Sequence, residues 1–149
     1  SISVHEAKSL IENERYQFVD VRELSEQQNV GVIPGAILSS RGMIEFHIDP
    51  DSPLHKSEFD QEKTYIFYCA SGARSALAAV AAKDMGLKPV VNMAGGITEW
   101  IKHGGSITDR DNDRYIYLFG GKNCDRIFRR ISFERTINRT CNPCGKGSD

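Results

Sequence analysis

The feature that most constrains the fold is a strand-like run followed almost at once by a helix-like run in the middle of the chain. Residues 64–69, TYIFYC, are nearly all apolar or aromatic, which is typical of a parallel strand covered on both faces. Residues 74–86, RSALAAVAAKDMG, are rich in alanine and are predicted to form a helix whose small side chains allow close packing on a sheet. This succession predicts a central sheet with at least one helix lying against it.

Strand-like and helix-like segments alternate along the first 107 residues. Short apolar runs predict strands at 17–21, 36–38, 64–69 and 88–93, and helices are predicted at 3–12, 22–28, 41–48, 74–86 and 95–105. Ser3 and Glu6 form the spacing of a capping box at the start of the first helix. Such alternation predicts an α/β fold with a mainly parallel sheet.

The alternating pattern ends near Ile107, and the charge changes sign there, from an acidic excess to a basic one. We therefore predict a folded domain at 1–107 and a basic C-terminal extension of uncertain structure at 108–149. Periodicity does not decide between a helix and a strand for the extension. Its apolar residues at 115–119 and 127–133 are expected to cover a face of the domain or of a second copy, which would make a homodimer through the tail.

Composition restricts the class of protein. Of the 149 residues, 40% are hydrophobic and 26% are charged, as in an ordinary soluble globular protein. No apolar run approaches the roughly 20 residues that span a bilayer, so no membrane partner is expected. A net charge of −1 gives no reason to expect nucleic acid as a partner. The few cysteines do not resemble a disulfide framework, and a reducing cytoplasm is the expected compartment.

Cys69 is the residue that most suggests chemistry. It ends the predicted central strand, and ASGA and an arginine follow before the helix. Loop amides and a helix N-terminus create a positive field in which a thiol loses its proton more readily, and the thiolate is a nucleophile. The loop residues Ala70, Ser71, Gly72, Ala73, Arg74 and Ser75 are therefore a candidate cradle for an anionic substrate. A lone cysteine is more often a buried packing residue, but its context here favours the nucleophile.

Four motifs in order resemble the rhodanese family, in its single-domain bacterial form. They are FVDVRE at 18–23, GVIPGAI at 31–37, CASGARS at 69–75 and GGITEW at 95–100. The resemblance implies a parallel sheet with helices on both faces and a sulfurtransferase that needs no organic cofactor. It also implies that Cys69 becomes a persulfide, taking sulfur from a small anionic donor such as thiosulfate and passing it to a thiol or other thiophilic acceptor.

The resemblance also assigns roles beyond the cysteine. Asp20 and Arg22 match the family's D-x-R and are expected to support the site. Val32 departs from the family pattern, which often has His before Ile-Pro-Gly. Residues 108–149 lie outside the resemblance.

Two other functions remain open from sequence. Phosphatases on the same fold have five residues between Cys and Arg, whereas this loop has four, so a phosphatase-like enzyme is disfavoured. The second is a persulfide carrier or sensing module that acts with a protein partner, and no residue of the sequence distinguishes it from an enzyme.

The extension contains the other three cysteines, Cys124, Cys141 and Cys144. Three thiols are weak candidates for a zinc site, because a closed structural site needs a fourth ligand and no histidine is nearby. The Cys141–Cys144 spacing also fits a redox pair, and incidental cysteines in a tail are an equally good reading. No metal site is predicted around Cys69.

Overall fold

The computed structural model describes residues 1–110, and these form a four-stranded, fully parallel sheet. The strands are β1 (Tyr16–Asp20), β2 (Ile37–Leu38), β3 (Thr64–Tyr68) and β4 (Val90–Asn92), in the order β2-β1-β3-β4. Asp20 lies beside Tyr68 in the β1–β3 register, so the carboxyl ends of the two central strands meet. The expected α/β fold with a parallel sheet is confirmed.

Five α-helices accompany the sheet in the described part of the chain. They are α1 (Val4–Ser9), α2 (Leu24–Val30), α3 (Ile44–Ile48), α4 (Ala73–Asp84) and α5 (Gly96–Lys102). The capping box at Ser3 and Glu6 is present at the start of α1. A short 3-10 helix, Ser57–Asp60, was not expected from the sequence.

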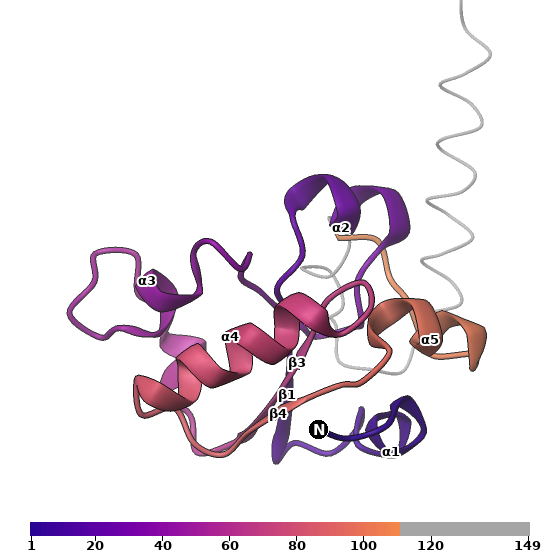
Figure 1. Cartoon of the computed structure of the whole chain (residues 1–149), viewed down its shortest axis with the longest axis horizontal. Helices are drawn as coiled ribbons and strands as arrows, with labels where there is room; N and C mark the ends of the chain where they lie inside the picture. The colour runs from indigo at the N-terminus through magenta and orange to yellow at the C-terminus, as the bar shows by residue number, and fades with distance from the viewer. Residues whose placement is uncertain (111–149) are drawn as a thin grey trace, which may run out of the picture. The chain divides into compact units, whose positions relative to one another are not determined.

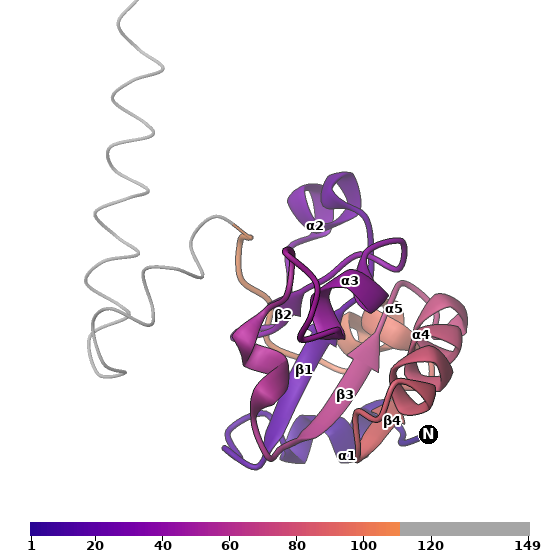
Figure 2. The same ribbon diagram turned by 90° about the vertical axis from the view of Figure 1, so that its left-hand side faces the viewer.

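Helices cover both faces of the sheet, as Figures 1 and 2 show, with α3 and α4 on one side and α1 and α5 on the other. Alternate residues of β3 divide between two cores: Tyr65 and Phe67 pack toward the α4 side, and Ile66 and Tyr68 toward the α1–α5 side. This two-sided burial explains why β3 is apolar throughout. In Figure 2, α2 lies beyond the carboxyl ends of the strands, where ligands bind in open parallel sheets.

The described chain continues past the predicted boundary at Ile107. Thr108 pairs with Val32 in an antiparallel bridge, with N–H···O distances of 2.9 Å in both directions, and Arg110 Nε donates to Gln27 Oε1 at 3.1 Å. Domain boundaries at 107/108 remain a prediction. No helix within residues 1–110 is both long and apolar enough to cross a membrane.

Candidate active site

Cys69 lies directly after β3, at the base of the loop that leads into α4. The residue is buried, with 1% of its surface exposed, and the Gly72 N–H donates to its Sγ at 3.1 Å. Gly72 is the N-cap of α4 and has a left-handed backbone, φ 100°, which turns its amide back toward the sulfur. The small loop residues thus place a backbone donor on the thiol.

The pKa of the Cys69 thiol is set by opposing effects. Burial raises it, but hydrogen bonds from Ser75 and from the backbone amides of Gly72 and Ser71 lower it, and the net pKa lies below the ordinary value. Ser75 Oγ lies 3.5 Å from Sγ and 2.7 Å from Asn92 Oδ1. Because a hydroxyl has one proton, it can donate to only one of these acceptors at a time. The amides are therefore the constant donors to the thiolate.

Asn92, at the end of β4, fixes the far side of the loop. Besides accepting from Ser75, its Nδ2 donates to the Gly72 carbonyl at 3.3 Å. There was little reason in the sequence to select Asn92, since its contacts depend on β4 lying next to β3 in the sheet. The only signal was its position at the carboxyl end of a predicted strand.

The start of α5 holds the other end of the loop. Ile97 N donates to the Cys69 carbonyl at 2.9 Å, and Thr98 N donates to the Ala70 carbonyl at 3.1 Å. These two bonds use N–H groups that a helix start leaves without intrahelical partners. Gly96 permits this approach, because a Cβ built there would lie 2.4 Å from the Cys69 carbonyl oxygen. This close approach explains why the GGITEW motif has a glycine at position 96.

Arg74 makes a two-pronged ion pair with Glu26 of α2. Its Nη1 and Nη2 donate to Glu26 Oε2 and Oε1, both at 2.7 Å, and both side chains are about a third exposed. Hydrogen bonding to Arg74 lowers the pKa of Glu26 to about 2, and the carboxylate in turn raises the pKa of Arg74. The sequence placed Arg74 at the substrate; here its charge is balanced, and it ties the loop to α2.

Asp20 and Arg22 form a buried ion pair beside the loop. Arg22 Nη2 donates to Asp20 Oδ2 at 2.7 Å and to the Gly31 carbonyl at 2.6 Å, and its Nε donates to Asp20 Oδ1 at 3.0 Å. The Arg22 guanidinium also lies 5.8 Å from the ring centre of Tyr68, the residue before Cys69. The pair holds the β1–α2 turn in place, and its expected role in supporting the site stays a prediction.

The predicted site residues are therefore brought to one end of the sheet, but they have different surroundings. The thiol is surrounded by the backbone amides of Ser71 and Gly72 and by the Ser75 side chain. Ala70 faces a pocket, and Ala73 is the first residue of α4. The links from the loop and strands to α2 are made by Arg74, Asp20 and Arg22. The tail cysteines Cys124, Cys141 and Cys144 lie outside the described residues. Sequence reasoning missed Glu26, Asn92 and the contact of Gly96.

The fold and site define a class: a parallel α/β domain that presents an amide-bound cysteine at the carboxyl end of its central strand. The family model described as the rhodanese-like domain matches residues 3–103, and the chain belongs to that family. This confirms the resemblance seen in the four sequence motifs.

Two curated relatives are named as sulfurtransferases. A sulfurtransferase of Allochromatium vinosum is 32% identical over 98 residues, covering 66% of this chain and 83% of its own. A thiosulfate:glutathione sulfurtransferase of Saccharomyces cerevisiae is 33% identical over 95 residues, covering 61% of this chain and 68% of its own. Among solved structures, a Rhodopseudomonas palustris protein of unknown function, described as a "possible tyrosine phosphatase", is 44% identical, with a TM-score of 0.70 over 72% of this chain and 83% of that one.

Proposed function

We propose that this protein is a sulfurtransferase that carries sulfane sulfur as a persulfide on Cys69. The observation that carries the proposal is the Cys69 thiol, which accepts a backbone hydrogen bond at 3.1 Å and has a lowered pKa. A thiolate held by amides is a ready nucleophile. Relatives named as sulfurtransferases support sulfur transfer as the class of reaction.

The proposed first half-reaction uses a small anionic donor such as thiosulfate. The Cys69 thiolate attacks the outer sulfur, a new S–S bond forms, and the donor's own S–S bond breaks. Sulfite leaves with the electron pair of that bond. Loop amides that stabilise a thiolate would equally stabilise the terminal sulfur of the anionic persulfide. In the second half-reaction a thiophilic acceptor removes this sulfur and restores the thiolate.

Mass spectrometry tests the carrier directly. After incubation with thiosulfate, the peptide that bears Cys69 should gain the mass of one sulfur atom, and a reductant should remove it. Cys69→Ser keeps the three tail cysteines and serves as the control. Sulfur gained by the serine variant but not by the Cys69 peptide of the parent would place the carrier elsewhere.

A phosphatase-like activity is the second candidate, because the Rhodopseudomonas palustris protein carries that description. Two features of the loop speak against it. Only four residues separate Cys69 from Arg74, and both terminal nitrogens of Arg74 are engaged by Glu26 rather than turned to an anion. Hydrolysis of p-nitrophenyl phosphate by the parent but not by Cys69→Ser would favour the phosphatase.

A persulfide carrier that works only with a protein partner has the same first half-reaction. Steady-state turnover of thiosulfate with cyanide and no other protein distinguishes an enzyme from such a carrier. We expect multiple turnovers.

A further inference from the structure

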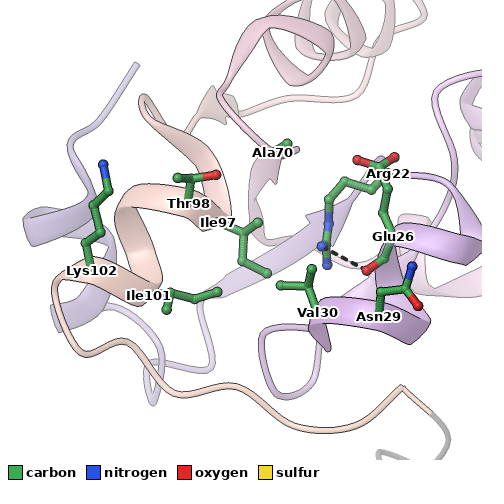
Figure 3. A pocket seen from close by; sticks show the side chains of 9 residues that line it. All are labelled: Arg22, Glu26, Asn29, Val30, Ala70, Ile97, Thr98, Ile101 and Lys102. Carbon is green, nitrogen blue, oxygen red and sulfur yellow. Dashed lines mark hydrogen bonds between the residues drawn. The ribbon is translucent and has the colours of Figure 1, made fainter.

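A pocket lies between α2 and α5, next to the loop that follows Cys69. Its volume is about 450 Å³, within the range of small-molecule sites. Figure 3 shows the side chains of Ile97 and Ile101, from α5, and of Val30, from α2, pointing into the space between the two helices, while Ala70 lies on the nearby loop. The centre of the pocket is therefore aliphatic.

Two of these aliphatic side chains remain open to solvent. Val30 is 45% exposed and Ile101 is 44% exposed, although each has an apolar neighbour across the pocket. Apolar surface left accessible in a concavity is favourable for binding another apolar group, because that binding removes both surfaces from water.

The charged residues of the pocket are already balanced. Arg22 pairs with Asp20, Glu26 pairs with Arg74, and Lys102 pairs with Glu99 at 2.6 Å. A small anion would gain little from such a lining, since each cation has an adjacent carboxylate. The charge pattern instead favours an uncharged, hydrocarbon-containing ligand.

The pocket is connected to the sulfur through the backbone. Ala70 lines it and directly follows Cys69, and Ile97, which also lines it, donates its N–H to the Cys69 carbonyl at 2.9 Å. A persulfide places its outer sulfur about 2 Å beyond Sγ, the length of an S–S bond. The transferable sulfur thus lies farther from the Cys69 backbone than Sγ does, and the pocket is lined by the next residue in the chain, Ala70.

We propose that this pocket binds the hydrocarbon body of an organic thiol that accepts sulfur from Cys69. The inference rests on the proposed sulfurtransferase function. The acceptor's sulfur attacks the outer sulfur of the anionic Cys69 persulfide, an S–S bond forms to the acceptor, and the Cys69 S–S bond breaks. The electron pair of the broken bond stays on Cys69 Sγ as a thiolate. The proton of the acceptor thiol passes to the outer sulfur, and the product is an alkyl hydropersulfide.

The test compares mercaptopropanol and mercaptohexanol, primary thiols that differ by three methylenes. Thiosulfate is the donor, and each rate is divided by that thiol's uncatalysed rate with a small aromatic disulfide. Burying three methylenes predicts a kcat/KM about tenfold or more higher for mercaptohexanol. Ile101→Ser should reduce this preference to about threefold or less.

Leu77→Ser is the matched control, because Leu77 is a helical aliphatic residue that is 65% exposed on α4 and does not line the pocket. It should keep the parent's preference for the longer thiol. Transfer to cyanide, measured in every variant, reports the Cys69 chemistry without an organic acceptor. Equal use of both thiols by a parent that does transfer sulfur to cyanide would overturn the pocket alone. A parent without any sulfur transfer would overturn the proposed function instead.

Discussion

Gly96→Ala adds only one methyl group but should lower both the stability of the domain and the rate of sulfur transfer. Gly96 has φ 59°, a left-handed conformation that costs an L-residue about 1 kcal/mol or more. A Cβ there would lie 2.4 Å from the Cys69 carbonyl oxygen and 2.5 Å from that of Ala70. These contacts are about 1 Å closer than carbon and oxygen normally approach, so α5 and the loop must separate.

Separation breaks the bonds from Ile97 and Thr98 to the same two carbonyls. Each bond contributes about 1 kcal/mol, so the total loss in unfolding free energy is about 3–4 kcal/mol. The loop also loses the support that holds Cys69 at the end of β3. We therefore expect slower sulfur transfer and an altered rate of alkylation of Cys69 by iodoacetamide, in addition to lower stability.

Gly104→Ala is the matched control. Gly104 has φ 69°, nearly the same backbone conformation, but a Cβ there would meet nothing within 4 Å. It should lose about 1 kcal/mol and keep its activity. Urea unfolding measures both variants, with m-values compared to confirm a common unfolded state. Equal losses in the two variants would refute the argument that close approach of α5 to the loop is what requires glycine.

Four further changes test other parts of the site. Cys69→Ser should abolish sulfur transfer while leaving the circular dichroism spectrum unchanged; turnover at the parent rate would remove Cys69 from the mechanism. Arg74→Ala should release the loop from Glu26 and lower kcat/KM for thiosulfate, and Arg74→Lys should recover only part of this, because an ammonium cannot reproduce the two-pronged geometry. Glu26→Gln should be less stable than the parent by roughly 1 kcal/mol at pH 7, because the Glu26–Arg74 pair is partly exposed. This difference in unfolding free energy should shrink as the pH falls from 4.5 toward 2, because protonation of Glu26 in the parent removes the ion pair. A difference that does not change with pH in urea titrations would contradict this. A chain ending at Arg110 should fold and keep its activity, because the four strands and the Thr108–Val32 bridge are retained; a folded but inactive product would implicate the extension.

The sequence predicted the elements of this fold well because their signals are local. The apolar run of β3, the alanines of α4 and the Ser3 capping box each act within a few residues, and each lies where it was expected. The loop around Cys69 was also readable, since a strand end, small residues and a helix start determine its geometry.

The contacts that complete the site are long-range in sequence, and they could not be predicted from it. Glu26 meets Arg74 across 48 positions of sequence, and Asn92 meets Ser75 across 17. From the sequence alone, Glu26 is one of several polar residues in a short predicted helix, and no pattern distinguishes it from its neighbours. Its pairing depends on α2 lying at the carboxyl ends of the strands, which is a result of topology.

The arrangement of the sheet also bears on aggregation. Segment 64–68, TYIFY, is uncharged, free of proline and rich in β-formers, the composition of sequences that stack between chains. It lies between β1 and β4 and so has no free edge. At the β4 edge, Ile2 donates to Asn92 O and accepts from Ala94 N, both at 2.9 Å, which occupies backbone groups that could recruit another strand. At the opposite edge, β2 is only two residues long. The strand order that places Cys69 at the end of a central strand thus also keeps the aggregation-prone segment 64–68 from pairing with strands of other molecules.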